Sequence, residues 1–444
     1  MTSIALANNS PLRHPDFIFG TATSSFQIEG DAANRLPCIW DTFCNTAGKI
    51  ADASNGLVAC EHVQRWQEDV ALIASLGVDA YRLSISWPRV IKQDGSLNTD
   101  GVAFYIKLLD GLNAKGIKPF VTLYHWDLPQ HIEDQGGWLN RNTANLFADY
   151  VSKIVPALGK RVHSYATFNE PFCSAYLGYE AGVHAPGKTG RKNGRQAAHH
   201  ILLAHGLGMQ QLQRLSPSTL NGIVLNFTPC YPATSRAEDI AATDKANQYI
   251  NHWYIKPLMD GCYPDILQEL AVDDRPEVRE GDFEIMQAPL DFLGVNFYTR
   301  LTYSAPSKAG EFYTELPHLA PQTDIGWEIY PQALTEWLVS LNQCYDLPPI
   351  YITENGAAMA DKLDDGEVLD YDRVAYYDGH LNALSEAMLQ GVDVKGYFAW
   401  SLMDNFEWAE GYQKRFGLVY VDYATQQRIP KLSAKAYSAL ITQR

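Results

Sequence analysis

Short apolar runs bounded by turn residues recur eight times along the chain. They are rich in β-branched and aromatic residues and are seven to eleven residues long, which is typical of buried strands with their flanking turns. Their pattern predicts strands over residues 17–23, 80–87, 119–126, 164–171, 221–227, 291–298, 349–356 and 394–404.

Amphipathic patterns with helical spacing lie between most neighbouring runs, and one of them stops on Gly77 just before a predicted strand. Alternation of strands and helices predicts parallel strands joined by crossover helices. Eight such units favour an α/β fold with one closed (β/α)8 TIM barrel, and we expect residues 1–444 to form a single catalytic domain. An open doubly wound sheet is the alternative, but no GxGxxG follows the first run. The predicted helices span residues 61–77, 101–117, 142–159, 195–215, 372–391 and 430–443.

The chain is longer than a minimal barrel needs. The surplus lies in residues 29–56 and in the stretches that follow the runs at 164–171, 221–227 and 291–298, the last of these being residues 302–324. We expect these stretches to be long βα loops that wall a deep pocket at the carboxyl ends of the strands.

Two of the apolar runs end on a glutamate. Glu170 closes the run at 164–171, Glu354 lies near the end of the run at 349–356, and each has an asparagine beside it. A lone glutamate at a strand end is usually a helix cap or a surface ion pair. Two of them at the carboxyl ends of barrel strands are predicted to face one pocket. Other strand ends supply polar or aromatic groups: Gln27, Arg82, His125, Trp126, Asn296, Tyr298 and Trp400.

Paired carboxyl groups in one pocket are the usual equipment for glycoside hydrolysis. One group must hold a proton for the leaving group, and the other must be ionised. Arg82 and Tyr298 would both favour ionisation of a nearby Glu354. Pro171 follows Glu170, and a residue before proline is biased to an extended backbone, so we expect Glu170 to be extended.

Composition excludes several other classes of protein. The net charge of −16 would repel a phosphate backbone, so we expect no nucleic-acid partner. The seven cysteines form no CxxC pair, no run of about 18 apolar residues suggests a membrane span, and no basic segment precedes an apolar start. We therefore expect a cytoplasmic enzyme without a membrane partner. Its oligomeric state is left open.

Metal chemistry is not indicated either. His199, His200 and His205 share a predicted helix but lack the HExxH spacing, so we interpret them as structural. We expect no metal and no cofactor. The 12% aromatic content, with 10 Trp and 25 Tyr, hints at a ligand with apolar C–H faces, such as a sugar.

At this point the motifs carry a family resemblance. TFNEP (167–171) together with YITENG (351–356) closely resembles the paired signatures of family 1 glycoside hydrolases, the β-glucosidase family. FIFGTATSSFQIEG, YRLSISWPRV, VTLYHWDLPQ, DFLGVNFYT, TDIGWEIYP and FAWSLMDNFEWAEGYQKRFGL follow in the family's order. The resemblance extends from about residue 17 to the C-terminal helix.

The resemblance implies a role for each matching position. Glu354 would be the nucleophile, and Glu170 the acid and later the base, of a double displacement with retention. Tyr298 and Arg82 would support the nucleophile. The remaining implied substrate-binding residues are Gln27, His125 and Glu407 for the remote hydroxyls, Asn169 for the 2-hydroxyl, Trp400 under the ring, Trp408 as a donor, Trp327 at the mouth, and Trp126, Asn296, Tyr298 and Phe416 around the pocket.

One position separates the subgroups of the family. Members that act on 6-phosphorylated sugars usually have a serine at the position of Glu407 and a tyrosine at the position of Phe416. An anionic Glu407 would repel a phosphate. Lys414 occurs in both subgroups. The resemblance therefore implies a β-glucosidase with a part in cellulose or other polysaccharide degradation. The deep pocket expected from the long loops suits removal of one terminal sugar, so we expect exo action on cellobiose, short oligosaccharides and aryl or alkyl β-glucosides. β-Galactosidase and β-fucosidase side activities stay open. The alternatives are a 6-phospho-β-glycosidase and a non-catalytic sugar-binding barrel.

Overall fold

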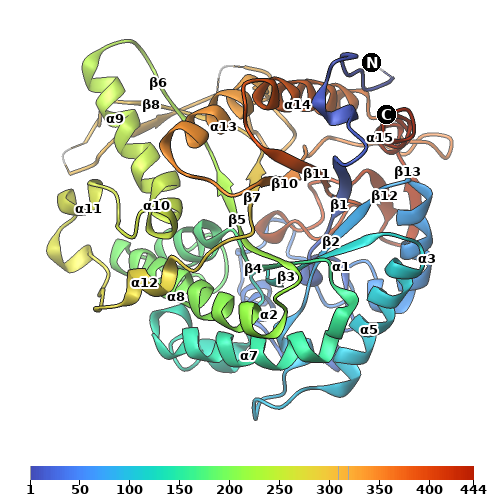
Figure 1. Cartoon of the computed structure of the whole chain (residues 1–444), viewed down its shortest axis with the longest axis horizontal. Helices are drawn as coiled ribbons and strands as arrows, with labels where there is room; N and C mark the ends of the chain where they lie inside the picture. The colour runs from blue at the N-terminus through green and yellow to red at the C-terminus, as the bar shows by residue number, and fades with distance from the viewer. Residues whose placement is uncertain (1, 309, 319) are drawn as a thin grey trace.

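The computed structural model describes residues 2–308, 310–318 and 320–444. Eight parallel strands close into a barrel, in the order β1-β11-β10-β7-β5-β4-β3-β2 (Figure 1). The predicted (β/α)8 barrel is confirmed, and each predicted run overlaps one of its strands, although β3 and β5 begin one residue earlier than predicted. These strands are β1 (Ile18–Ala22), β2 (Ala80–Ser84), β3 (Lys118–Tyr124), β4 (Ser164–Asn169), β5 (Leu220–Phe227), β7 (Phe292–Phe297), β10 (Ile350–Asn355) and β11 (Val394–Trp400).

Helices surround the barrel (Figure 1). All six predicted helices are present: α3 (His62–Ser75), α5 (Thr99–Ala114), α7 (Asn142–Leu158), α8 (Arg191–Leu215), α14 (Tyr371–Leu389) and α15 (Leu432–Thr442). Sequence patterning missed α9 (Ala237–Asn247), α10 (Trp253–Met259) and α13 (Gln332–Cys344). The shorter helices are α1 (Ser25–Ile28), α2 (Ile39–Cys44), α4 (Trp87–Val90), α6 (Gln130–Glu133), α11 (Ile266–Glu269) and α12 (Asp282–Met286).

The long segments predicted as βα loops contain small elements of their own. Helices α1 and α2 follow β1, and a π-helical segment, η5 (Cys173–Glu180), follows β4. Strands β6 (Cys230–Pro232), β8 (Leu301–Ser304) and β9 (Thr314–Leu316) form a three-stranded sheet from the segments after β5 and β7. Residues 309 and 319 of the predicted loop 302–324 lie outside the described residues. A hairpin of β12 (Val419–Asp422) and β13 (Gln427–Pro430) precedes α15.

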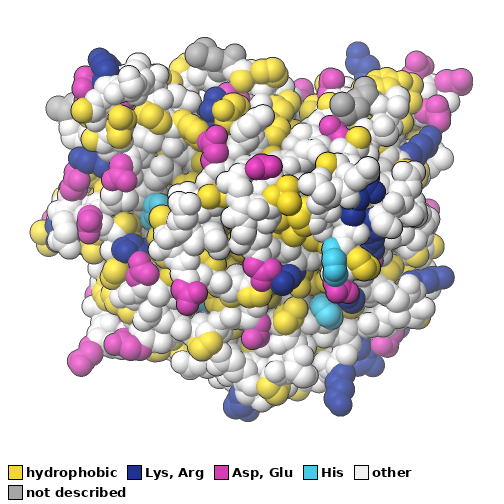
Figure 2. All heavy atoms as spheres, turned by 45° about the horizontal axis from the view of Figure 1, so that its top comes forward, with side chains coloured by type: hydrophobic (Ala, Val, Ile, Leu, Met, Phe, Trp, Pro, Cys, Tyr) yellow, Lys and Arg dark blue, Asp and Glu magenta, His cyan; other side chains and the backbone are white. Residues whose placement is uncertain are grey.

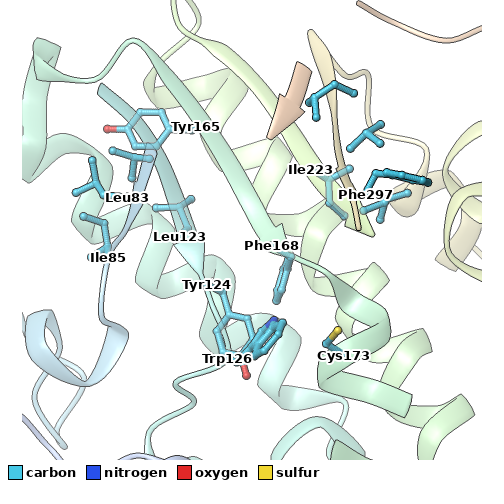
Figure 3. Close-up of a cluster of buried hydrophobic side chains, with 14 of the residues drawn as sticks. Leu83, Ile85, Leu123, Tyr124, Trp126, Tyr165, Phe168, Cys173, Ile223 and Phe297 are labelled. Carbon is cyan, nitrogen blue, oxygen red and sulfur yellow. The ribbon is translucent and has the colours of Figure 1, made fainter. Parts of the chain in front are cut away.

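The inside of the barrel is filled by side chains from all eight strands. The ring of Phe120 lies 5.5 Å from that of Tyr351 and 4.9 Å from that of Phe398, and alanines from other strands belong to the same buried cluster. Gly20 is required here, because a Cβ at this position would lie 2.4 Å from the ring of Phe398. Figure 3 shows another part of the core, where Leu83, Leu123, Phe168 and Ile223 from successive strands are buried. The packed interior forms an apolar floor below the carboxyl ends of the strands.

The two ends of the chain lie side by side (Figure 1). Arg444 donates to the carbonyl oxygen of Phe17 at 2.7 Å and pairs with Asp79, so the C-terminus is fastened to the start of β1. On the face shown in Figure 2, acidic and basic side chains are interspersed. Among the residues that the structure describes, none of the helices combines the length and the apolar character that crossing a membrane would require.

Candidate active site

A pocket of about 410 Å³ opens at the carboxyl ends of the barrel strands. Its volume lies in the range of small-molecule sites. Eleven predicted site residues line it: His125, Trp126, Glu170, Asn296, Tyr298, Trp327, Glu354, Trp400, Glu407, Trp408 and Phe416. The other three, Gln27, Arg82 and Asn169, lie behind the wall and hydrogen-bond to residues that form it.

Irregularities in two strands direct the polar side chains into the pocket. The register of β4 against β5 shifts between Ala166 and Asn169, and the register of β10 against β7 shifts between Ile352 and Glu354. A bulge inserts a residue and changes the face on which the next side chain lies. The apolar alternation of each strand therefore gives way to polar residues at its carboxyl end.

The backbone of Glu170 differs from the prediction. We expected an extended conformation because Pro171 follows, but φ of Glu170 is +49°, in the left-handed region. This prediction is wrong. Trp126 and Trp408, which also line the pocket, have φ of +77° and +50°. Left-handed backbone is strained for residues with a Cβ and tends to occur at functional sites, where surrounding packing holds it.

Glu354 is held by two donors. Arg82 Nη1 donates to Oε1 at 2.5 Å, and the hydroxyl of Tyr298 donates to Oε2 at 2.6 Å. Burial raises the pKa of this carboxyl, while the Arg82 guanidinium and the Tyr298 hydroxyl act against that rise because both stabilise the anion. Both contacts agree with the supporting roles expected for Arg82 and Tyr298.

Glu170 has a different environment. Asn296 Nδ2 donates to Oε1 at 2.7 Å, and the thiol of Cys173 donates to Oε2 at 3.1 Å. Burial, and then the negative charge of Glu354, raise the pKa of Glu170 to about 8. Neither of its direct donors is charged, so between the two carboxyls the proton belongs on Glu170.

Two asparagines connect the carboxyls. Asn169 Oδ1 accepts from Arg82 at 2.7 Å and from Asn296 at 3.0 Å, which leaves its Nδ2 3.1 Å from His125 Nε2. Asn296 is itself oriented, because its Oδ1 accepts from the hydroxyl of Thr353 at 2.7 Å. The network fixes both carboxyls relative to one another across β2, β4, β7 and β10.

A third carboxyl, Glu407, also lines the pocket. Gln27 Nε2 lies 3.4 Å from Glu407 Oε2 and also donates to the Phe406 carbonyl at 2.8 Å. Burial and the charges of Glu354 and Glu170 raise the pKa of Glu407 to about 8. A carboxyl with this pKa is largely neutral at pH 7. Repulsion of a phosphate by an anionic Glu407 is therefore a weaker argument than the sequence suggested.

Contacts of Lys414 bear on the same question. Its ammonium donates to the backbone oxygen of Asp324 at 2.6 Å and pairs with the Asp324 carboxylate at 3.1 Å. Phe416, which lines the pocket, carries no hydroxyl. A phosphate would have to displace Asp324 from Lys414 before it could use that cation.

Aromatic rings form much of the wall. The rings of His125 and Trp400 are nearly parallel at 5.9 Å, and Trp126 lies 4.5 Å from Trp408. Trp126 already donates its indole N–H to the Asn169 carbonyl at 2.9 Å, so it can offer a ligand only its ring. His125 Nδ1 is buried without a hydrogen-bond partner in the described part of the chain. A ligand hydroxyl would satisfy it.

Several lining residues were not predicted. Asn226, Phe227 and Thr228 follow the strand rule and could have been found, because they lie at the carboxyl end of β5. The others lie on the segments that connect the barrel strands, where a single sequence offers no signal. They are Phe172, Cys173, Leu177, Val183, His184, Thr299, Leu301, Ile325, Ala409 and Glu410, most of them apolar.

The histidines of α8 have structural contacts. His199 contacts Tyr263 and Asp282 at 2.8 Å each, His200 contacts the Trp138 carbonyl at 2.9 Å, and His205 contacts Thr167 at 2.7 Å. These contacts agree with the structural interpretation. Within residues 2–308, 310–318 and 320–444, no group of three or more His, Cys, Asp or Glu side chains is placed to hold a metal ion.

Comparisons with known proteins place nearly the whole chain in one family. The family model described as Glycosyl hydrolase family 1 matches residues 11–444. A β-glucosidase of Agrobacterium sp. is 45% identical over 98% of this chain and 96% of its own length. A bifunctional β-D-glucosidase/β-D-fucosidase of Bifidobacterium breve is 42% identical over 96% and 97%. The solved structure of a family 1 β-glucosidase from Thermotoga maritima superimposes with a TM-score of 0.94, at 40% identity, covering 97% of this chain and 98% of that one.

Proposed function

Because this chain belongs to glycosyl hydrolase family 1, we propose that it is a retaining, exo-acting β-glucosidase. The observation that carries the proposal is the unequal setting of two buried carboxyls in one pocket. Glu354 accepts hydrogen bonds from a guanidinium and a phenol, whereas Glu170 accepts them from an amide and a thiol. Similar relatives that carry the name β-glucosidase support the choice of substrate.

In the first step, Glu354 attacks the anomeric carbon while Glu170 gives its proton to the departing oxygen. General acid catalysis of this kind contributes about 10²–10⁴-fold. A covalent glycosyl-enzyme forms, and Arg82 and Tyr298 hold the attacking carboxylate in position.

In the second step, Glu170 acts as a base toward water. Formation of the ester removes the negative charge from Glu354, and that charge is the largest cause after burial of the high pKa of Glu170. The pKa of Glu170 must therefore fall once the intermediate forms. Glu170 can then accept a proton from the attacking water, and the β configuration is retained.

Sugar recognition is proposed for the polar groups around Glu407. Gln27, His125 and Glu407 would bind the hydroxyls remote from the anomeric carbon, Asn169 the 2-hydroxyl, and Trp400 the ring face. His125 Nδ1 supports this assignment, since it is buried and unpartnered within the described residues. Trp126, Asn296, Trp408 and Phe416 would complete the glucose site.

The leaving group would occupy the outer part of the pocket, beside Trp327. The apolar floor inside the barrel supports removal of one terminal sugar, since a chain could not pass through. Apolar residues of the outer wall, among them Leu177 and Ile325, favour aryl and alkyl glucosides beside cellobiose and short oligosaccharides. A β-fucosidase side activity is supported by a bifunctional β-D-glucosidase/β-D-fucosidase that is 42% identical. A β-galactosidase side activity is proposed beside it, without support from a named relative. We also propose that the chain acts as one catalytic domain, since the family match spans residues 11–444.

A pair of chromogenic substrates tests the proposal. Incubation with 4-nitrophenyl β-D-glucoside is expected to release 4-nitrophenol, and its 6-phosphate is expected to release none. Colour from the phosphate alone would transfer the chain to the 6-phospho-β-glycosidases, and colour from neither would favour a sugar-binding barrel. Proton NMR of the first product is expected to show β-glucose before mutarotation. Initial α-glucose would refute retention.

A further inference from the structure

The thiol of Cys173 touches the proposed acid. Cys173 begins the π-helical segment η5, three residues after Glu170, and its backbone N–H donates to the Glu170 carbonyl at 3.0 Å. Its sulfur lies 3.1 Å from Glu170 Oε2, and the side chain is buried in the pocket wall. Figure 3 shows Cys173 at the start of the helical segment that follows β4. The tight turn between the two residues fixes the sulfur relative to the carboxyl.

The two oxygens of Glu170 are not equivalent. Oε1 accepts from Asn296 Nδ2, and Asn296 cannot turn its oxygen to this position because that oxygen is held by Thr353. Oε1 is therefore an acceptor in both protonation states of Glu170. Because Oε1 is occupied by Asn296, we assign the proton of the neutral acid to Oε2, the oxygen that Cys173 contacts.

A thiol suits this position because its S–H can donate to Oε2 in both protonation states of Glu170. Burial, and then the charge of Glu170, raise the pKa of Cys173 well above its usual value, so the group stays a thiol. It does not compete with Glu354 as a nucleophile, since the thiolate is the reactive form of cysteine.

We propose, on the basis of the proposed function, that Cys173 is a positioning residue for the proton of Glu170. In the resting state the S–H donates to Oε2 from the pocket wall, which leaves the proton on Oε2 free to point into the pocket. When that proton passes to the leaving group, the same S–H donates more strongly to the carboxylate that is left. The thiol neither gains nor loses a proton over the cycle.

Other titratable groups around Glu170 stay in place when Cys173 is changed. They are Arg82 on β2, Glu354 on β10, Tyr298 after β7, Glu407 after β11, and the imidazoles of His125 and His184 in the same wall. Burial lowers the pKa of both imidazoles, that of His184 to about 4. The two rings are neutral over the pH range in which Glu170 titrates.

The test is the alkaline limb of kcat/KM, which reports the free enzyme's acid. Loss of the S–H donor in Cys173→Ala and Cys173→Val is expected to move that limb to higher pH by about half a unit or more, because the anion loses a hydrogen bond. A hydroxyl is a stronger donor, so Cys173→Ser is expected to move the limb to lower pH. Cys60→Ala is the matched control, since Cys60 is also buried but its thiol contacts the Asp404 carbonyl at 3.3 Å. It is expected to leave the limb unchanged.

The opposite shifts expected for Cys173→Ala and Cys173→Ser distinguish a role in positioning the proton from a role in packing alone. An unmoved limb in all three Cys173 variants, or a move in one direction for all of them, would overturn the inference. Turnover by wild type and Cys60→Ala shows in the same experiment that the proposed function stands. An infrared readout needs no turnover: the S–H stretching band that disappears in Cys173→Ala is expected to move to lower frequency as pH rises through the titration of Glu170. A band independent of pH would contradict the proposal.

Discussion

At the scale of single residues, the site depends on two glutamates with different neighbours. Their positions could be predicted, because each ends an apolar run beside an asparagine. Their settings could be predicted only in part: Arg82 and Tyr298 were expected next to Glu354, but the left-handed φ of Glu170 contradicts the rule for residues before proline. Tertiary contacts override that local preference.

Replacement of each glutamate by glycine should distinguish the two roles. Glu354→Gly is expected to lower turnover of aryl glucosides by roughly 10⁴-fold or more, since the attacking group is lost. Added azide fits the space of the lost carboxylate and is expected to give an α-glycosyl azide. Glu170→Gly, with a good leaving group and azide, is expected to give the β-glycosyl azide. The configuration of each azide, determined by NMR, shows which glutamate is the nucleophile. A β product from Glu354→Gly would reverse the assignment.

At the scale of elements, the strands were predictable and the loops were not. Period and turn signals located all eight barrel strands, but the register shifts in β4 and β10 leave no mark in a single sequence. The loop after β11, residues 401–418, is set by a buried group of charges. Lys431 donates to Asp404 at 2.7 Å and to Asp361 at 2.6 Å, and Arg415 donates to Asp404 at 2.6 Å. These pairs fasten the segment that carries Glu407, Trp408 and Phe416.

Removal of the buried cation should therefore destabilise the fold and weaken sugar binding. In Lys431→Met, the buried carboxylates of Asp361 and Asp404 lose a positive charge that offsets theirs. This loss is expected to lower the free energy of unfolding by about 3–5 kcal/mol. Urea unfolding measures this loss, and KM for 4-nitrophenyl β-D-glucoside is expected to rise. Lys435→Met on α15 is the matched control: Lys435 and its partner Glu367 are 57% and 58% exposed, so a change within about 0.5 kcal/mol is expected. Equal losses in both variants would contradict a special role for the buried group.

At the scale of the whole molecule, the buried carboxyl Glu170 is expected to lower the stability of the fold at alkaline pH. Glu170 titrates near pH 8 in the folded chain and near pH 4.3 when unfolded. Its raised pKa stabilises the folded state fully below about pH 4, and this contribution is lost as pH rises through 8. Charge is then forced into a buried pocket that already holds Glu354.

Glu170→Gln should reveal this effect, because a neutral amide does not titrate. The Tm of the variant minus that of wild type is expected to increase by at least about 2 °C between pH 5 and pH 9, measured by scanning calorimetry. Glu277→Gln serves as control: Arg279 lowers the pKa of this exposed carboxyl, so its contribution is constant over the same range. A difference for Glu170→Gln that stays flat or declines with pH would show that Glu170 is already ionised at pH 5.

The rings of Phe120, Tyr351 and Phe398 close the barrel below the pocket, so molecules cannot pass through the barrel. In the proposed double displacement, therefore, the aglycone would leave first, and the monosaccharide would leave later through the opening by which the next substrate enters. Between those two departures the ester on Glu354 would be exposed only to molecules that enter from that opening. An alcohol that reaches the ester before water would form a new glucoside. At high sugar concentration we therefore expect glycoside synthesis beside hydrolysis.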